Sequence, residues 1–258
     1  MVVFFDIDGT LVDDDTQILP ESAVRAVEAL RDRGHIPVIN TGRPFLHIDP
    51  RVRAMAFAGW ICSCGMEVRL GQKVLSRTVP TLEQGLLVRD AVRECRMRAL
   101  YETDDGGLLL DEDPAGVHGD VQIRRLTDMG IYLAQIGDHP RFQKLVTFDG
   151  ASGDRQTFLE RVRPCFDVVD RGRGMLELMG RGCSKARGME ILLKELGADP
   201  EDTLAIGDST NDLPMFRAAG HTVCMGGGMA QARAEAEYVT APVLEDGIAE
   251  ALAHFVLI

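Results

Sequence analysis

The first fifteen residues constrain the fold more than any other part of the sequence, because an apolar run leads directly into paired carboxylates. Val2 to Ile7 is typical of a buried β-strand, yet Asp6 and Asp8 stand at its end, and Asp13 to Asp15 follow in a polar turn. Crowding carboxylates at the end of a buried strand is costly unless positive charge compensates them. The sequence therefore predicts that a cation or a cationic side chain meets these acids.

A strand, a helix and a second strand follow one another at the N-terminus. Residues 20–34 have the pattern of an amphipathic helix between Pro20 and a terminating glycine, and Ile36 to Asn40 form an apolar run that ends in Thr41-Gly42-Arg43. This order predicts a right-handed βαβ unit with parallel strands. Ligands of such sheets bind at the carboxyl ends of the strands, where Asp6 and Asp8 would meet Thr41.

The two ends of the chain differ in pattern from its middle. Helices and strands alternate again over residues 184–255, whereas the middle mixes them without strict alternation. The predicted fold is α/β, with a doubly wound, Rossmann-like parallel-sheet core from residues 1–79 and 182–258 and an inserted α+β domain over residues 80–181. The elements expected around and within the insert are a hairpin over Met66–Val79, helices over Thr81–Met97 and Asp154–Val162, and strands near Arg98–Glu102, Phe142–Phe148, Phe166–Val169 and Met175–Leu178.

Composition excludes several classes of protein. The 40 acidic and 28 basic residues give a net charge of -12, which argues against a nucleic-acid binder, because phosphate backbones need a basic face. No apolar stretch approaches the length of a membrane span, and the short apolar run before Asp6 does not have the pattern of a signal peptide. The six cysteines lack disulfide-framework spacing, so reduced thiols and a cytoplasmic location are expected.

Four short segments carry the chemistry of the chain. They are Asp6-Ile7-Asp8-Gly9-Thr10-Leu11, Thr41-Gly42-Arg43, Ser184-Lys185 and Gly207-Asp208-Ser209-Thr210-Asn211-Asp212. In this order, with three at strand ends and the lysine at a helix start, they resemble the haloacid dehalogenase (HAD) superfamily of phosphohydrolases. The mixed insert resembles that of its Cof-type subfamily, which has a large α/β cap domain, and the resemblance covers essentially the whole chain.

Charge counting agrees with a metal site at the sheet edge. Asp6, Asp8, Asp208 and Asp212 would bring four negative charges together and raise each other's pKa values. Mg²⁺ and the Lys185 ammonium supply three positive charges. Because Mg²⁺ prefers oxygen ligands and keeps places for water and phosphate, the sequence predicts a Mg²⁺ site formed by these four acids.

The resemblance implies roles for five residues of the first three segments. Asp6 would be the nucleophile that forms an aspartyl-phosphate, and Asp8 would protonate the leaving oxygen and later deprotonate the attacking water. Asp8 also favours phosphoryl transfer over dehalogenation, since halide leaves without a proton. The Thr41 hydroxyl and the Gly42 N–H would bind phosphoryl oxygens, and Lys185 would neutralise Asp6 and the transferring group.

The fourth segment would complete the site. Asp208 would ligate Mg²⁺ directly and Asn211 would hydrogen-bond the phosphoryl group. Asp212 would support the metal either directly or through its waters, and the sequence leaves this choice open.

The chain departs from the Cof-type pattern at three places. Cys64-Gly65-Met66 replaces the usual Asn-Gly-Ala, Ala186 replaces a glycine after the lysine, and Gly227 replaces the asparagine of Met-Gly-Asn. These positions lie outside the proposed nucleophile, acid and metal ligands, so hydrolysis is still expected, while contacts on the substrate side are less well defined.

The resulting hypothesis is a Mg²⁺-dependent phosphatase for a small phosphorylated metabolite, such as a sugar phosphate or a phosphorylated cofactor. A phosphomutase on the same scaffold and a non-catalytic phospho-acceptor resembling a receiver domain are the alternatives. Receivers are single small domains without an acid two residues after the acceptor, so Asp8 and the insert count against the second. Neither the substrate nor the oligomeric state follows from the sequence.

Overall fold

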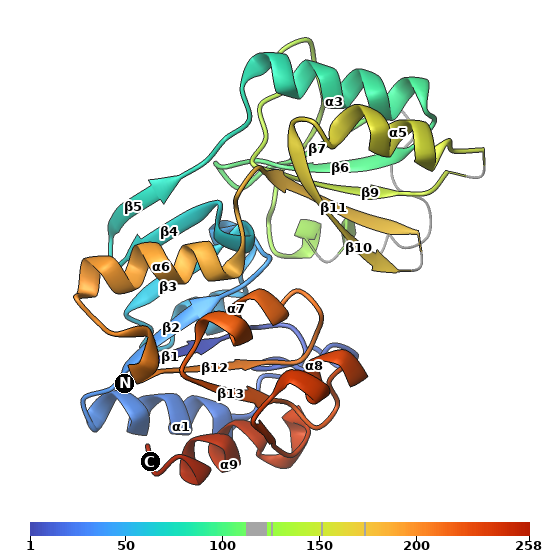
Figure 1. Cartoon of the computed structure of the whole chain (residues 1–258). Helices are drawn as coiled ribbons and strands as arrows, with labels where there is room; N and C mark the ends of the chain where they lie inside the picture. Colours follow the sequence, from blue (N-terminus) through green and yellow to red (C-terminus); the bar gives the residue numbers. More distant parts are fainter. Residues whose placement is uncertain (112–122, 125, 151, 173) are drawn as a thin grey trace. The chain divides into compact units, whose positions relative to one another are not determined.

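The computed structural model describes residues 1–111, 123–124, 126–150, 152–172 and 174–258. These residues form two compact units (Figure 1). The core unit comprises Met1–Gly42, Pro50–Arg77 and Ser184–Ile258, and the insert unit comprises Arg43–Asp49 and Thr78–Cys183. The sequence predicted an insert over residues 80–181 and placed residues 43–49 in the core.

The core unit is built on an eight-stranded sheet with the order β14-β13-β12-β1-β2-β3-β4-β5. Its strands are β1 (Val2–Phe5), β2 (Ile36–Asn40), β3 (Gly59–Cys62), β4 (Glu67–Leu70), β5 (Lys73–Arg77), β12 (Thr203–Gly207), β13 (His221–Cys224) and β14 (Tyr238–Val239). The strands from β14 to β3 are parallel, and β4 and β5 continue the sheet as an antiparallel hairpin. The α/β class, the parallel pairing of β1 with β2 and the hairpin are confirmed.

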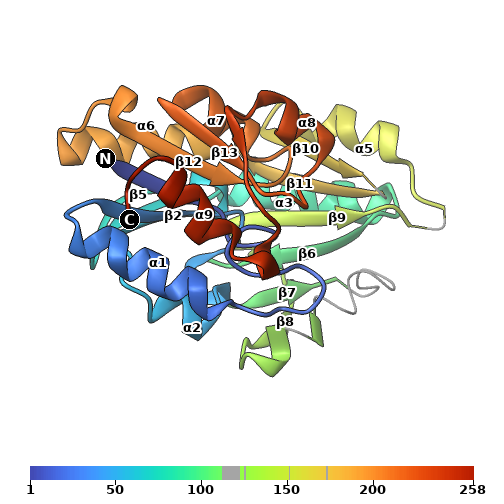
Figure 2. The same cartoon turned by 90° about the horizontal axis from the view of Figure 1, so that it is seen from below.

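Helices cover both faces of the core sheet, as a doubly wound fold requires (Figure 1). The helices of this unit are α1 (Glu21–Asp32), α2 (Pro50–Arg53), α6 (Lys185–Leu196), α7 (Leu213–Ala218), α8 (Ala230–Glu235) and α9 (Gly247–His254), with single turns η2 (Ser63–Gly65), η3 (Pro200–Asp202) and η4 (Val243–Glu245). Residues of α6, α7 and α8 pack in one cluster with Phe4, Val38 and Ile61 of the sheet. Helices α1 and α9 lie side by side on the other face (Figure 2).

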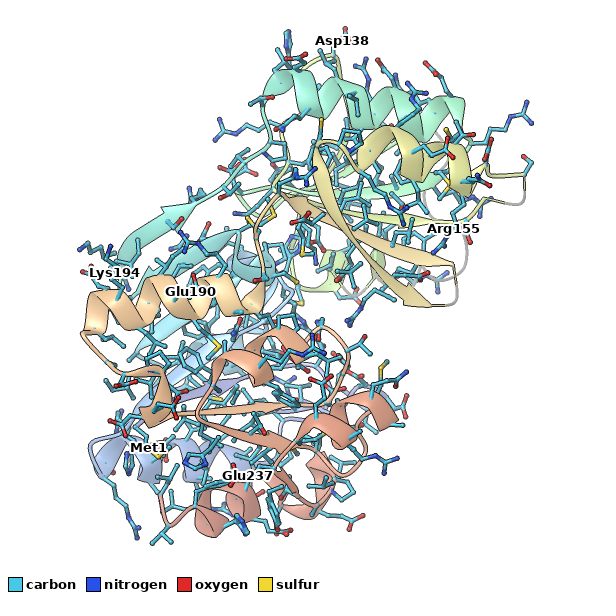
Figure 3. The ribbon with its side chains drawn as sticks, in the orientation of Figure 1. Met1, Asp138, Arg155, Glu190, Lys194 and Glu237 are labelled. Carbon is cyan, nitrogen blue, oxygen red and sulfur yellow. The ribbon has the colours of Figure 1, made fainter. Side chains whose placement is uncertain are left out.

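Helix α6 shows why the flanking helices form where they do. Ser184 caps its first turn by accepting a hydrogen bond from the Arg187 N–H at 3.0 Å, and the left-handed Gly197 ends it. Its apolar side chains face the sheet, while Glu190 and Lys194 are exposed on the outer side of the helix (Figure 3). This two-sided pattern fixes the rotation of α6 and hence the direction of Lys185 at its start.

The insert unit has a six-stranded sheet with the order β10-β11-β9-β6-β7-β8. Its strands are β6 (Arg98–Glu102), β7 (Leu108–Leu110), β8 (Leu133–Gln135), β9 (Lys144–Phe148), β10 (Phe166–Gly172) and β11 (Met175–Gly180). All neighbours are antiparallel except β7 and β8. The α+β character of the insert is confirmed, although the three-residue strands β7 and β8 had no sequence signal long enough to predict them.

Two helices cover one face of the insert sheet. Helices α3 (Leu82–Glu94) and α5 (Arg155–Val162) pack against Tyr101, Leu145 and Leu176 of the strands. Thr81 begins α3 with a capping box, in which its side chain and that of Gln84 each accept the other's backbone N–H. The single turn η1 (Phe45–His47) belongs to this unit through the segment Arg43–Asp49. No helix in the described part of the chain is long and apolar enough to span a membrane.

Candidate active site

The candidate site lies where three adjacent strands of the core sheet end. Strands β12, β1 and β2 are neighbours, and Asp208, Asp6 and Thr41 follow them directly. The Asp6 N–H still donates to the Ile206 carbonyl at 3.0 Å, so the hydrogen-bonded pairing of β1 with β12 continues to Asp6. The parallel sheet thus brings together segments that are about two hundred residues apart, as the sequence predicted.

Lys185 is the centre of the site. Its Nζ lies 2.8 Å from Asp6 Oδ2 and 2.5 Å from Asp212 Oδ1, and the side chain is only 1% exposed. It is the first residue of α6, where the positive end of the helix dipole disfavours a cation. Burial opposes its charge, but the carboxylates of Asp212 and Asp6 outweigh burial and raise the pKa of Lys185, so it stays protonated.

Asp212 holds the turn after β12 as well as the lysine. Its Oδ2 accepts the backbone N–H groups of Asp208 and Ser209, both at 2.9 Å, while its Oδ1 accepts from Lys185. A Cβ on Gly207 would lie 2.5 Å from the Asp212 Cγ, so only glycine permits this approach. The carboxylate therefore fixes both the Asp208 backbone and the Lys185 ammonium.

Asp208 approaches the loop after β1 just as closely. Gly9 has a positive φ of 69°, and a Cβ at this position would lie 2.5 Å from Asp208 Oδ2. The Thr10 hydroxyl donates to Asp208 Oδ1 at 3.4 Å. Gly9 thus has a steric function, because the absence of a Cβ lets the Asp208 side chain approach the loop after β1.

Asp6, Asp208 and Asp212 form a group that fits a divalent cation. One carboxylate oxygen from each lies within 4.8 Å of the others, and no other such group of acid, histidine or cysteine ligands occurs among the described residues. Burial, with a further contribution from neighbouring acids, raises the pKa of Asp6 to about 7 and that of Asp208 to about 8, although Lys185 opposes both shifts. A bound Mg²⁺ would favour the ionised form of these carboxyl groups by offsetting their negative charge. Because Mg²⁺ also prefers oxygen ligands, the donor set fits that ion.

The other predicted site residues lie in the same loops. Asp8 is half-buried, and its negative charge contributes to raising the pKa of Asp6. Its carboxylate is not part of the three-acid group. Thr41 is buried, its N–H donating to the Ile61 carbonyl at 2.8 Å, and Gly42 follows it. The metal-ligand role of Asp8 and the phosphoryl contacts of Thr41 and Gly42 stay predictions.

Asn211 is oriented by its neighbour in the same turn. The Ser209 hydroxyl donates to Asn211 Oδ1 at 2.7 Å, so the amide NH₂ of Asn211 points away from Ser209. An amide held this way presents donors, as hydrogen bonding to a phosphoryl group would require. That contact, too, stays a prediction.

The sequence reading assigned no role to three residues that touch this site. Thr10 contacts Asp208, and Ser209 contacts Asn211. Both stand inside the quoted segments, and that membership was the available signal. Asn40 precedes Thr41 and donates to the Lys185 carbonyl. A polar residue at the end of an otherwise apolar strand was its only signal.

Cys64, one of the three departures from the Cof-type pattern, is hydrogen-bonded to the loop after β2. Its N–H donates to the Thr41 carbonyl at 3.0 Å, and its backbone is left-handed with φ of 54°. Asparagine adopts this conformation more readily than cysteine, which explains the residue usual in related sequences. A Cβ on Gly227 would meet no atom within 4 Å, so no packing demands a glycine there.

An open α/β sheet with a buried lysine and clustered acids at the carboxyl ends of adjacent strands is suited to metal-assisted phosphoryl transfer. Comparison with known sequences agrees. The sequence profile of the haloacid dehalogenase-like hydrolases matches residues 3–252. The chain belongs to this family and is an enzyme of the phosphoric monoester hydrolase class.

Individual relatives cover nearly the whole chain. It is 30% identical over 264 residues to the putative phosphatase YkrA of Bacillus subtilis, covering 97% of this chain and 96% of that protein. It is 24% identical over 260 residues to the 5-amino-6-(5-phospho-D-ribitylamino)uracil phosphatase YcsE of the same organism, covering 99% and 96%. Among solved structures, the subclass IIB sugar phosphatase BT4131 is similar with a TM-score of 0.86, at 25% identity, covering 100% of this chain and 99% of that one.

Proposed function

We propose that the chain is a Mg²⁺-dependent phosphatase that hydrolyses a small phosphorylated metabolite through an aspartyl-phosphate on Asp6. The observation that carries this proposal is the position of Lys185 between Asp6 and Asp212, with Asp208 in the same cluster. One ammonium does not neutralise this group of acids. The site is therefore suited to receive a divalent cation together with the oxygens of a phosphate ester.

In the first half-reaction, a carboxylate oxygen of Asp6 attacks phosphorus. The bond between phosphorus and the ester oxygen breaks, and Asp8 gives its proton to that oxygen, which leaves as the alcohol. Lys185 holds Asp6 in place and offsets the negative charge of the transferring group. A bound Mg²⁺ would screen the repulsion between carboxylate and phosphate, with Asp6, Asp208 and Asp212 available to hold it.

In the second half-reaction, Asp8 takes a proton from water, and the resulting nucleophile attacks the aspartyl-phosphate. The bond between phosphorus and the Asp6 oxygen breaks, which releases inorganic phosphate and restores both carboxyl groups to their starting states. The amide of Asn211 and the N–H of Gly42 are the donors that would bind the phosphoryl oxygens in both steps.

The substrate class is a small organic phosphate monoester. Support comes from similar proteins that are named as phosphatases of a phosphorylated ribitylamino-uracil and of a sugar phosphate. The net charge of -12 also disfavours large polyanionic substrates. Sugar and sugar-alcohol phosphates and phosphorylated cofactor precursors are therefore the first compounds to screen.

The test is release of inorganic phosphate from para-nitrophenyl phosphate, with Mg²⁺ and with EDTA, followed by a panel of phosphorylated metabolites. We expect turnover that needs Mg²⁺ and that Asp6→Asn abolishes. Asp199→Asn is the matched control, because this exposed aspartate caps a surface turn through Glu201 N–H and asparagine caps equally well. A wild type that keeps a stable phosphoryl group without turnover, or that only moves phosphate between positions of a sugar phosphate, would contradict the hydrolase assignment.

A further inference from the structure

Asn40 is a buried polar residue on the same sheet face as the nucleophile. Strands β1 and β2 pair in register, with Phe4 opposite Val38, and both of these side chains pack toward α6. Side chains alternate along a strand, so Asp6 and Asn40, two residues further along each strand, also face α6. Asn40 is 0% exposed.

From this position Asn40 contacts the main chain of the catalytic lysine. Its Nδ2 donates to the Lys185 carbonyl at 3.2 Å. Asp6 and Asp212 hold the other end of the same residue through its ammonium, at 2.8 and 2.5 Å. Lys185 is therefore fixed both at its backbone and at its charged end.

Stability does not explain an asparagine here. Because the Lys185 carbonyl can only accept, the amide orientation is set, and Asn40 Oδ1 is a buried acceptor that finds no hydrogen-bond donor in the part of the chain that the structure describes. A buried acceptor left without a hydrogen-bond donor destabilises the folded state. An apolar side chain of similar size would avoid that cost, and the Lys185 carbonyl lies at a helix position where the backbone ladder of α6 offers it another donor.

We infer that Asn40 is a positioning residue for Lys185. It ties the end of β2 to the first residue of α6 and so keeps the ammonium between Asp6 and Asp212 when the phosphoryl group arrives. Its own atoms do not take part in bond making or breaking. The inference rests on the proposed phosphatase function for its kinetic consequence, but the geometry of Lys185 can be measured without catalysis.

The test compares Asn40→Leu, which is close in size, and Asn40→Ala with the wild type. We expect kcat for para-nitrophenyl phosphate to fall about 10- to 100-fold, since small misplacements of a catalytic group have effects of this size. The melting temperature should be unchanged or higher in Asn40→Leu, because the unsatisfied acceptor is removed. Thr203→Val is the control: it removes a buried hydroxyl that donates to the Pro200 carbonyl at 2.6 Å, at the opposite end of β12, and should lower the melting temperature without changing kcat.

A second readout is the ¹H–¹⁵N NMR signal of the Lys185 ammonium, which burial protects from exchange and which Lys185→Met identifies by its loss. It should shift or broaden in both Asn40 variants and stay in place in Thr203→Val. An unchanged signal, or an unchanged kcat in an active enzyme, would overturn the inference, as would a loss of kcat that only tracks a loss of stability. If the wild type itself releases no phosphate, the proposed function fails, and the NMR signal alone decides the role of Asn40.

Discussion

Each unit of the molecule contains a buried lysine between two carboxylates, and the two differ in charge balance. In the core unit, Lys185 lies between Asp6 and Asp212. In the insert unit, Lys144 of β9 lies 3.2 Å from Glu102 Oε2 and 3.4 Å from Glu177 Oε1 and is about as deeply buried.

The two clusters differ in the charged group that lies beside the lysine and its two carboxylates. Asp208 joins the core cluster as a third acid, and Asp8 adds to the same field. In the insert, a second cation is present instead, because Arg171 Nε lies 3.9 Å from Glu177 Oε2, and His47 Nδ1 lies 3.9 Å from Glu102 Oε1. The two glutamates, the lysine and the arginine sum to zero charge.

This difference separates a structural ion network from a reactive site. Balanced buried charges can satisfy one another within the fold, whereas an excess of carboxylates has to recruit a cation or take up protons. We therefore expect the stability of the core unit to depend on Mg²⁺ and pH. The stability of the insert unit should depend chiefly on whether every member of its ion network is present.

The largest expected effect is on catalysis. Lys185→Met should lower kcat for para-nitrophenyl phosphate about 10²- to 10³-fold, because it removes the cation beside the nucleophile and the transferring group. Lys144→Met should leave kcat per folded molecule within about twofold. Phosphate release at saturating substrate, normalised to the folded fraction, measures both. An equal loss in the two variants would show that the insert network takes part in the reaction.

Lys144→Met should instead lower the stability of the insert unit. Removing one partner of a buried ion network costs about 3–5 kcal/mol, since Glu102 and Glu177 lose a shared cation. Adding Glu102→Gln to Lys144→Met should recover part of this loss, because Glu177 still has Arg171. Urea unfolding followed by far-UV circular dichroism reports the change. A double variant less stable than the single one would contradict the charge-balance account.

The metal-free core unit should become more stable as the pH falls. Burial raises the pKa of Asp6 to about 7 and that of Asp208 to about 8, so the folded state binds protons more tightly than the unfolded state. Stability then increases as the pH falls from about 8 toward the ordinary aspartate value of about 4. Trp60 of β3 is the single tryptophan of the chain, so its fluorescence in EDTA follows the core unit.

Asp208→Asn is the control for this pH dependence. It removes one of the two titrating acids, so its melting temperature should vary less with pH than that of the wild type. If the melting temperature of the wild type decreases when the pH is lowered from 8 to 6, these acids are ionised without cost in the metal-free fold.

The smallest effect is expected for an exposed ion pair. Arg217 binds Glu235 through two hydrogen bonds of 2.9 and 2.6 Å, but its side chain is largely exposed. Glu235→Gln should change the free energy of unfolding by less than about 1 kcal/mol, because water and salt screen such pairs. Trp60-monitored urea unfolding tests this. A loss as large as that of Lys144→Met would mean that burial does not separate strong from weak pairs in this protein.

The sequence predicted the elements and residues whose signals are local. The alternation of strand and helix around Asp6 and Thr41 and the turn from Asp208 to Asp212 were readable, since apolar periodicity and strand-end acids lie close together in the chain. The resemblance to a known family supplied the order of the segments and the role of Lys185. It did not reveal Asn40, whose contact with Lys185 depends on how β2 and α6 pack.

The insert network could not have been predicted from spacing. Glu102, Lys144, Arg171 and Glu177 come from four different strands, and only the sheet order brings them together. The placement of Arg43–Asp49 in the insert unit depends on contacts such as that of His47 Nε2 with the Gly106 carbonyl at 3.2 Å. Such pairings are set by tertiary structure, and no periodic pattern encodes them.

The Trp60-monitored melting temperature, measured with and without millimolar Mg²⁺, shows whether the excess acids of the core unit bind a metal ion. Mg²⁺ should raise the melting temperature of the wild type, because binding to the folded state alone stabilises it. The rise should shrink or vanish in Asp208→Asn and persist in Glu177→Gln, which alters the insert network only. A wild type that does not respond to Mg²⁺, or an Asp208→Asn variant that responds as the wild type does, would contradict the claim that the excess acids of the core unit form a metal site.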